Sequence, residues 1–134
     1  MNDNFYKRLL TTVSVLGIAG VAFGAFGAHF LRSRLDPESM EVIRTAILYL
    51  FIHTLATLLI ILLGRTDTSS RVLKITGVFF VVGVILFTGS LLLIATRALT
   101  GFQAGFIGFA TPLGGVFFIS AWACLLYYSL TRKI

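Results

Sequence analysis

Two histidines and a tyrosine are the side chains of this sequence whose type and spacing suit chemistry in an apolar setting. His53 follows Tyr49 by four residues, so both lie on one face of a helix, and His29 lies in a separate apolar stretch. An ionisable side chain inside a membrane segment is a functional candidate by default, because burial in lipid is costly. Imidazoles ligate heme iron or zinc and carry protons. The aromatic content of 13% could line a quinone or lipid pocket.

Depth argues against a site that the two histidines share. We place His29 at the outer end of the first apolar stretch and His53 about eight residues inside the second, which separates them by about 10 Å along the membrane normal. A shared iron or zinc ion stays open only if these borders are wrong by several residues. We expect a neutral His53 bonded to Tyr49, a serine or a backbone carbonyl. We expect His29 to cap the first helix or to contact Glu41 or Tyr49. No catalytic residue, cofactor or metal site is predicted.

The elements that carry these side chains are four apolar stretches without Asp, Glu, Lys or Arg, at 9–30, 45–64, 75–96 and 101–131. Roughly 20 apolar residues cross a hydrocarbon core in a helix, and each stretch is that long. Charged residues make up 12% of the chain, against about 25% in soluble domains. We therefore predict an all-α fold, one polytopic membrane domain over 1–134, built as a four-transmembrane-helix bundle with spans near 9–31, 43–64, 75–96 and 111–131.

The fourth stretch is too long for one ordinary span. Pro112 would cost a backbone hydrogen bond in mid-helix, and residues 101–110 are rich in Gly and Phe. We expect an interfacial or re-entrant segment there, followed by a new helix with Thr111 as its cap and Pro112 at its first position. The alternative is one continuous, tilted helix with a kink at Pro112. Earlier in the chain, Asp36 and Pro37 predict the start of the second helix in the same way.

Small and polar residues at helical spacing predict the packing faces. On the first helix, Gly20, Gly24 and Ala28 are four apart, flanked by Gly17 and Gly27, and such residues let two backbones approach closely. We expect this face to meet the polar stripe of the second helix, so that Gly24→Leu separates the two. Further packing positions on the third and fourth helices are Gly89, Ser90, Gly114, Gly115 and Trp122.

The net charge of +6 does not indicate nucleic-acid binding, because the basic residues flank the apolar stretches, where they meet lipid headgroups. Seven of the 11 Lys and Arg residues fall on one predicted face, which favours the cytoplasmic side for that face. Both termini are therefore predicted to be cytoplasmic. These seven are Lys7, Arg8, Arg65, Arg71, Lys74, Arg132 and Lys133.

Several motifs together resemble one family, the small bacterial inner-membrane proteins of the YgdD/YwdK type, which have a mitochondrial transmembrane relative. The motifs are residues 24–29 (GAFGAH), Tyr49 with His53, residues 87–90 (FTGS), and residues 111–115 (TPLGG) with Trp122. The resemblance covers all four spans in order. It implies a four-helix protein of the bacterial plasma membrane and a loose link to envelope integrity, and it implies no reaction. This chain departs from the family in its longer 102–110 segment.

Three functions fit these observations. The first is a non-enzymatic structural or accessory membrane protein, which acts through helix packing with itself as a homo-oligomer or with a membrane-protein partner in the lipid bilayer. The second is a small-molecule transporter or channel that uses Tyr49 and His53, although no Asp or Glu lies inside any span. The third is a subunit that binds heme, quinone or lipid.

Overall fold

The computed structural model describes residues 4–101, 103 and 105–131, and for residue 28 the backbone alone. No strand occurs among these residues, so the all-α class is confirmed. The helices are α1 (Asn4–Phe26), the π-helical turn η1 (Gly27–Leu31), α2 (Pro37–Gly64), α3 (Arg71–Ala95), the short α4 (Arg97–Thr100), the 3-10 turn η2 (Ile107–Phe109) and α5 (Ala110–Thr131).

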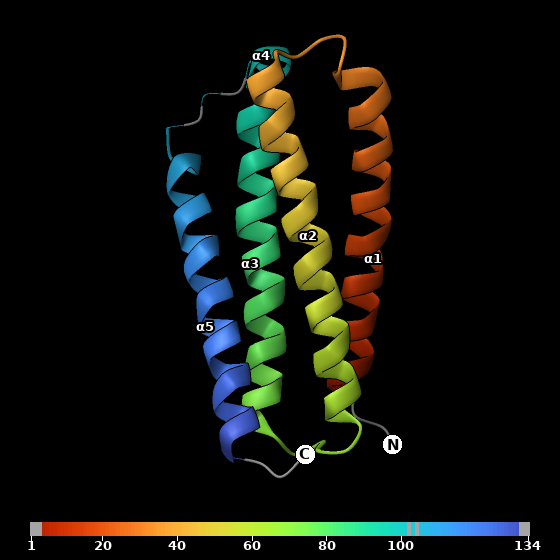
Figure 1. Ribbon diagram of the computed structural model, residues 1–134, viewed down its shortest axis with the longest axis vertical. Coiled ribbons are helices and arrows are strands. Elements are labelled where there is room, and N and C mark those ends of the chain that lie inside the picture. Colours follow the sequence, from red (N-terminus) through yellow and green to blue (C-terminus); the bar gives the residue numbers. More distant parts are fainter. Residues whose placement is uncertain (1–3, 102, 104, 132–134) are drawn as a thin grey trace.

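Four helical segments of this described chain are long and apolar enough to cross a membrane, as predicted: α1 with η1, α2, α3, and η2 with α5. They lie side by side in the order α5, α3, α2, α1 (Figure 1). The third helix packs against both α2 and α5, whereas α1 packs mainly against α2. The start of α1 and the end of α5 lie at the same end of the bundle (Figure 1).

The second helix begins where the sequence predicts. Asp36 has an extended backbone, and its carboxylate accepts a hydrogen bond of 2.8 Å from the Ser39 backbone N–H. The Ser39 hydroxyl donates to the other carboxylate oxygen at 2.8 Å, and these bonds lower the pKa of Asp36. Pro37 occupies the first turn, where its missing N–H costs nothing.

The chain before α5 is broken, as the sequence predicts, and the alternative of one continuous helix is wrong. Gly101 ends α4 with a φ of 67°, a left-handed conformation that glycine adopts without strain. The expected cap, however, is wrong. The helix α5 begins at Ala110, so Thr111 already lies inside it and bonds elsewhere. Pro112 stays in the first turn, where backbone N–H groups have no helical partner to lose.

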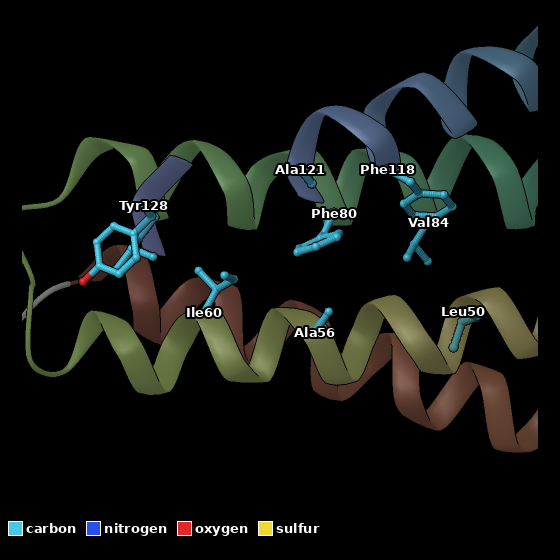
Figure 2. Packing of buried hydrophobic residues seen from close by; sticks show 9 residues of the cluster. Leu50, Ala56, Ile60, Phe80, Val84, Phe118, Ala121 and Tyr128 are labelled. Atoms are coloured by element: carbon cyan, nitrogen blue, oxygen red, sulfur yellow. The ribbon is translucent and has the colours of Figure 1, made fainter. Parts of the chain in front are cut away.

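The buried core lies among α2, α3 and α5 (Figure 2). The side chains of this core pack closely along the bundle. Close packing is what holds helices together in lipid, because the surrounding lipid is as apolar as the helices and the hydrophobic effect does not drive them together. A smaller cluster of Leu31, Met40, Ile43 and Ala95 packs the end where α1 turns into α2. The main cluster consists of Leu50, Ala56, Ile60, Leu73, Phe80, Val84, Phe118, Ala121 and Tyr128.

The small face of α1 meets α2 differently from the expectation. A Cβ added at Gly20 would lie 2.7 Å from the Leu50 side chain, so this glycine packs tightly against α2. At Gly24 the nearest atom belongs to Ile47, at 3.9 Å. The predicted partner, the polar stripe of α2, points instead toward α3 and α5. An added Cβ at Gly24 thus makes only an ordinary van der Waals contact, which argues against the expectation that Gly24→Leu separates the helices.

Candidate functional site

Six aromatic rings meet in the middle of the bundle, and we call them the aromatic cluster. The His53 ring stacks on Phe118 with centroids 3.5 Å apart and planes 10° apart. Tyr49 stacks on Phe87 at 4.6 Å, and Phe80 meets Trp122 edge-on at 5.2 Å. The cluster joins α2, α3 and α5, and consists of Tyr49, His53, Phe80, Phe87, Phe118 and Trp122.

Both ring nitrogens of His53 have partners. Nδ1 lies 2.8 Å from the Tyr49 carbonyl oxygen, and the Trp122 indole N–H donates to Nε2 at 3.4 Å. Because an indole N–H can only donate, Nε2 accepts and the single ring proton lies on Nδ1, which donates to the Tyr49 carbonyl. The expectation of a His53 bonded to a backbone carbonyl is thus confirmed, and the neighbours select one tautomer.

This environment encloses the His53 side chain. Its side chain is only 5% exposed, and Phe118 covers one ring face. A second proton on Nε2 would meet the Trp122 donor head-on, which turns an attraction into a repulsion. A metal ion at Nε2 would have to displace the same indole. The described arrangement therefore holds the imidazole as a packed hydrogen-bonding unit.

The structure does not bring His29 to His53. His29 is exposed in η1, two residues after Gly27. A Cβ added at Gly27 would meet Ile43 at 3.5 Å. His53 is ten residues beyond Ile43 along α2, which is ~15 Å at ~1.5 Å per residue. One metal ion cannot span that distance. The Glu41 carboxylate, a suggested partner of His29, contacts Arg44 at 3.3 Å instead.

Two predicted positions on α3 and α5 meet directly. The hydroxyls of Ser90 and Thr111 are 2.6 Å apart across the two helices. One turn further along α5, a Cβ added at Gly114 would lie 2.6 Å from the Phe87 backbone nitrogen. Hydroxyl pairs and glycine contacts are the usual means of joining helices in lipid.

Other predicted positions are not brought into the site. Added Cβ atoms at Gly89 and Gly115 would meet nothing within 4 Å. Gly24 and Gly27 line a groove between α1 and α2. The side chain of Ala28 lies outside the described residues.

Phe80, Phe87 and Phe118 are not among the predicted site residues, because a phenylalanine in a membrane span usually serves only to fill space between helices. A signal was nevertheless present. Phe118 is four residues from both Gly114 and Trp122, so the three share a face of α5. Phe80 and Phe87 are seven apart on α3, and that spacing also repeats one face.

Comparison with known proteins identifies relatives. A family model described as a protein of unknown function (DUF423) matches residues 23–115. The chain is 34% identical over 131 residues to the Escherichia coli UPF0382 inner membrane protein YgdD, which covers 95% of this chain and 92% of the relative. A Haemophilus influenzae UPF0382 membrane protein is 33% identical over 127 residues, or 95% and 97% of the two chains. Bacillus subtilis YwdK, also a UPF0382 membrane protein, is 28% identical over 120 residues, which cover 90% of this chain and 94% of the relative. No solved structure matches the chain significantly.

Proposed function

The chain belongs to the DUF423 family, whose relatives are named as membrane proteins, and on that premise we propose that it is a non-enzymatic structural or accessory protein of the bacterial inner membrane. It supports membrane or envelope integrity by packing its helices against a second copy or a membrane-protein partner. The observation that supports this proposal is the enclosure of His53, the strongest candidate for a chemical role. Its ring stacks on Phe118, and its Nε2 accepts a hydrogen bond from Trp122.

The outer face of α1 is the surface we assign to that partner. Ser14, Ile18 and Val21 are exposed along one side of the helix, and Gly17 lies between them with nothing within 4 Å of an added Cβ. Their spacing of three and four residues forms a continuous stripe. A glycine in such a stripe allows a second helix to approach closely.

The orientation follows from charge. The end of the bundle that carries the start of α1 also carries Arg65, Arg71 and Lys74, so we assign that end to the cytoplasm. In a Cys124→Ser background, a maleimide that cannot cross the membrane should label Ser33→Cys from outside intact spheroplasts. It should label Ser69→Cys only after lysis. The reverse labelling pattern would invert the topology.

Site-specific cross-linking in living cells tests the partner surface. A photoreactive phenylalanine analogue at Ile18 should give a discrete protein adduct, a second copy or a partner of defined mass. The matched control is Ile119 on α5, because both side chains are 72% exposed. We expect lipid adducts alone at Ile119. Absence of a protein adduct at Ile18 would contradict the proposed role of this face.

A transport assay tests the alternative function, that of a transporter or channel. Proteoliposomes that carry the purified chain should show no more ion or solute flux than empty vesicles. A flux that His53→Ala abolishes, in a variant that still folds, would replace the structural role with the transporter alternative.

A further inference from the structure

A groove opens between α1 and α2 beyond the contact of Gly20 with Leu50, toward the end of the bundle that carries η1. It has a volume of about 390 Å³. Gly24 and Gly27 form one wall without side chains, and Ile43, Ile47 and Phe51 form the other. Toward this end of the bundle α2 slants away from α1, so the two helices diverge (Figure 1). Pockets of roughly 300–1,000 Å³ are the size that holds small organic ligands.

The groove is apolar along its length and positively charged at its end. Arg32, just after η1, and Arg44, early in α2, both line it. From Met40 to Phe51 it follows α2 for ~16 Å, at ~1.5 Å per residue, toward the middle of the bundle. A charged end at the membrane border and an apolar end at greater depth match the two parts of a phospholipid.

The charges at the border fit one negative group. Arg44 contacts Glu41 at 3.3 Å, and both side chains remain about two-thirds exposed, at 67% and 69%. A guanidinium has five N–H donors, so this pair leaves Arg44 with donors to spare. Two arginines and one glutamate carry a net charge of about +1 at neutral pH. A phosphodiester, with a single negative charge, balances it.

We propose that the groove between α1 and α2 is a binding site for one anionic phospholipid. Arg32 and Arg44 bind its headgroup phosphate, since guanidinium groups recognise phosphate oxygens in a bidentate manner. One acyl chain lies against Gly24, Gly27 and the aliphatic wall of α2. The lipid thereby fills the space that the two diverging helices leave between them, and this site exists independently of the partner surface proposed above.

Native mass spectrometry of the full chain tests the site, with phosphatidylglycerol and phosphatidylcholine as probes in matched detergent micelles. We expect one phosphatidylglycerol retained per chain and less phosphatidylcholine. Arg32→Gln with Arg44→Gln should reduce the retained phosphatidylglycerol about tenfold, because each arginine attracts anionic lipid. Arg97→Gln, which removes one charge at the same end of the bundle but outside the groove, should change retention little.

Filling the groove tests the acyl chain separately. Gly24→Leu has space for its side chain, since the nearest atom to the added Cβ is 3.9 Å away, and it should displace the lipid without unfolding the bundle. Gly115→Leu on α5 is the control, because an added Cβ there meets nothing within 4 Å and Gly115 lies outside both the groove and the partner surface. Thermal stability in the same detergent verifies that each variant is folded.

Three outcomes overturn the site. Equal retention of the two lipids excludes recognition of charge. Retention unchanged in the folded Arg32→Gln, Arg44→Gln double variant excludes the headgroup contacts. A dimer mass that only Gly24→Leu dissociates shows that a second copy of this chain, and not a lipid, occupies the groove.

Discussion

Replacing Gly114 with leucine is expected to separate α5 from α3 and to destabilise the bundle by at least about 3 kcal/mol, since overpacking typically costs ~1–3 kcal/mol and more where nothing yields. The added Cβ would lie 2.6 Å from the Phe87 backbone nitrogen and 2.9 Å from its Cα. Backbone inside a helix cannot move aside as a side chain can. The free energy of unfolding, measured in mixed micelles with increasing SDS, should show the loss.

The neighbouring glycine supplies the control. A Cβ added at Gly115 meets nothing within 4 Å, so Gly115→Leu should leave stability unchanged or raise it by up to ~1 kcal/mol, because leucine favours helix over glycine. The two substitutions are the same in chemistry and adjacent in sequence. Equal losses at both positions would mean that α5 does not pack on α3 through Gly114.

Removing the imidazole of His53 is expected to cost about 3 kcal/mol of stability. His53→Ala leaves a cavity beside Phe118, and buried large-to-Ala substitutions lose ~2–5 kcal/mol. It also leaves the Trp122 indole N–H without its acceptor. His53→Phe restores a ring against Phe118 but not the acceptor, and should recover part of the loss. The same unfolding measurement applies.

His29→Ala is the matched control, since His29 is exposed in η1, and surface substitutions generally change stability by less than ~0.5 kcal/mol. A fully stable His53→Ala variant would show that the imidazole is not part of the packed core. It would then be a candidate for a group that titrates during transport.

The sequence predicts the helical segments because each depends on local features. A membrane span needs only enough consecutive apolar residues. The start of α2 at Pro37 needs only the neighbouring Asp36, which caps the helix. The break before α5 is predicted from Pro112 and from the Gly- and Phe-rich residues 101–110, which are likewise local features. The cap at Thr111 was the local expectation that failed, since the Thr111 hydroxyl bonds to Ser90, a residue on another helix.

Which faces meet was decided by the tertiary structure. The polar stripe with Tyr49 and His53 and the small face with Gly20 were both evident in the sequence, but their pairing was predicted wrongly. In lipid, helices associate by shape and by hydrogen bonds between residues far apart in the chain, so a face defined on one helix does not determine its partner. Four apolar helices long enough to span a membrane, with a histidine inside one of them, can be predicted from composition and spacing alone. Only the packing of α5 onto α2 and α3 placed Phe118 and Trp122 around that histidine and fixed its proton on Nδ1.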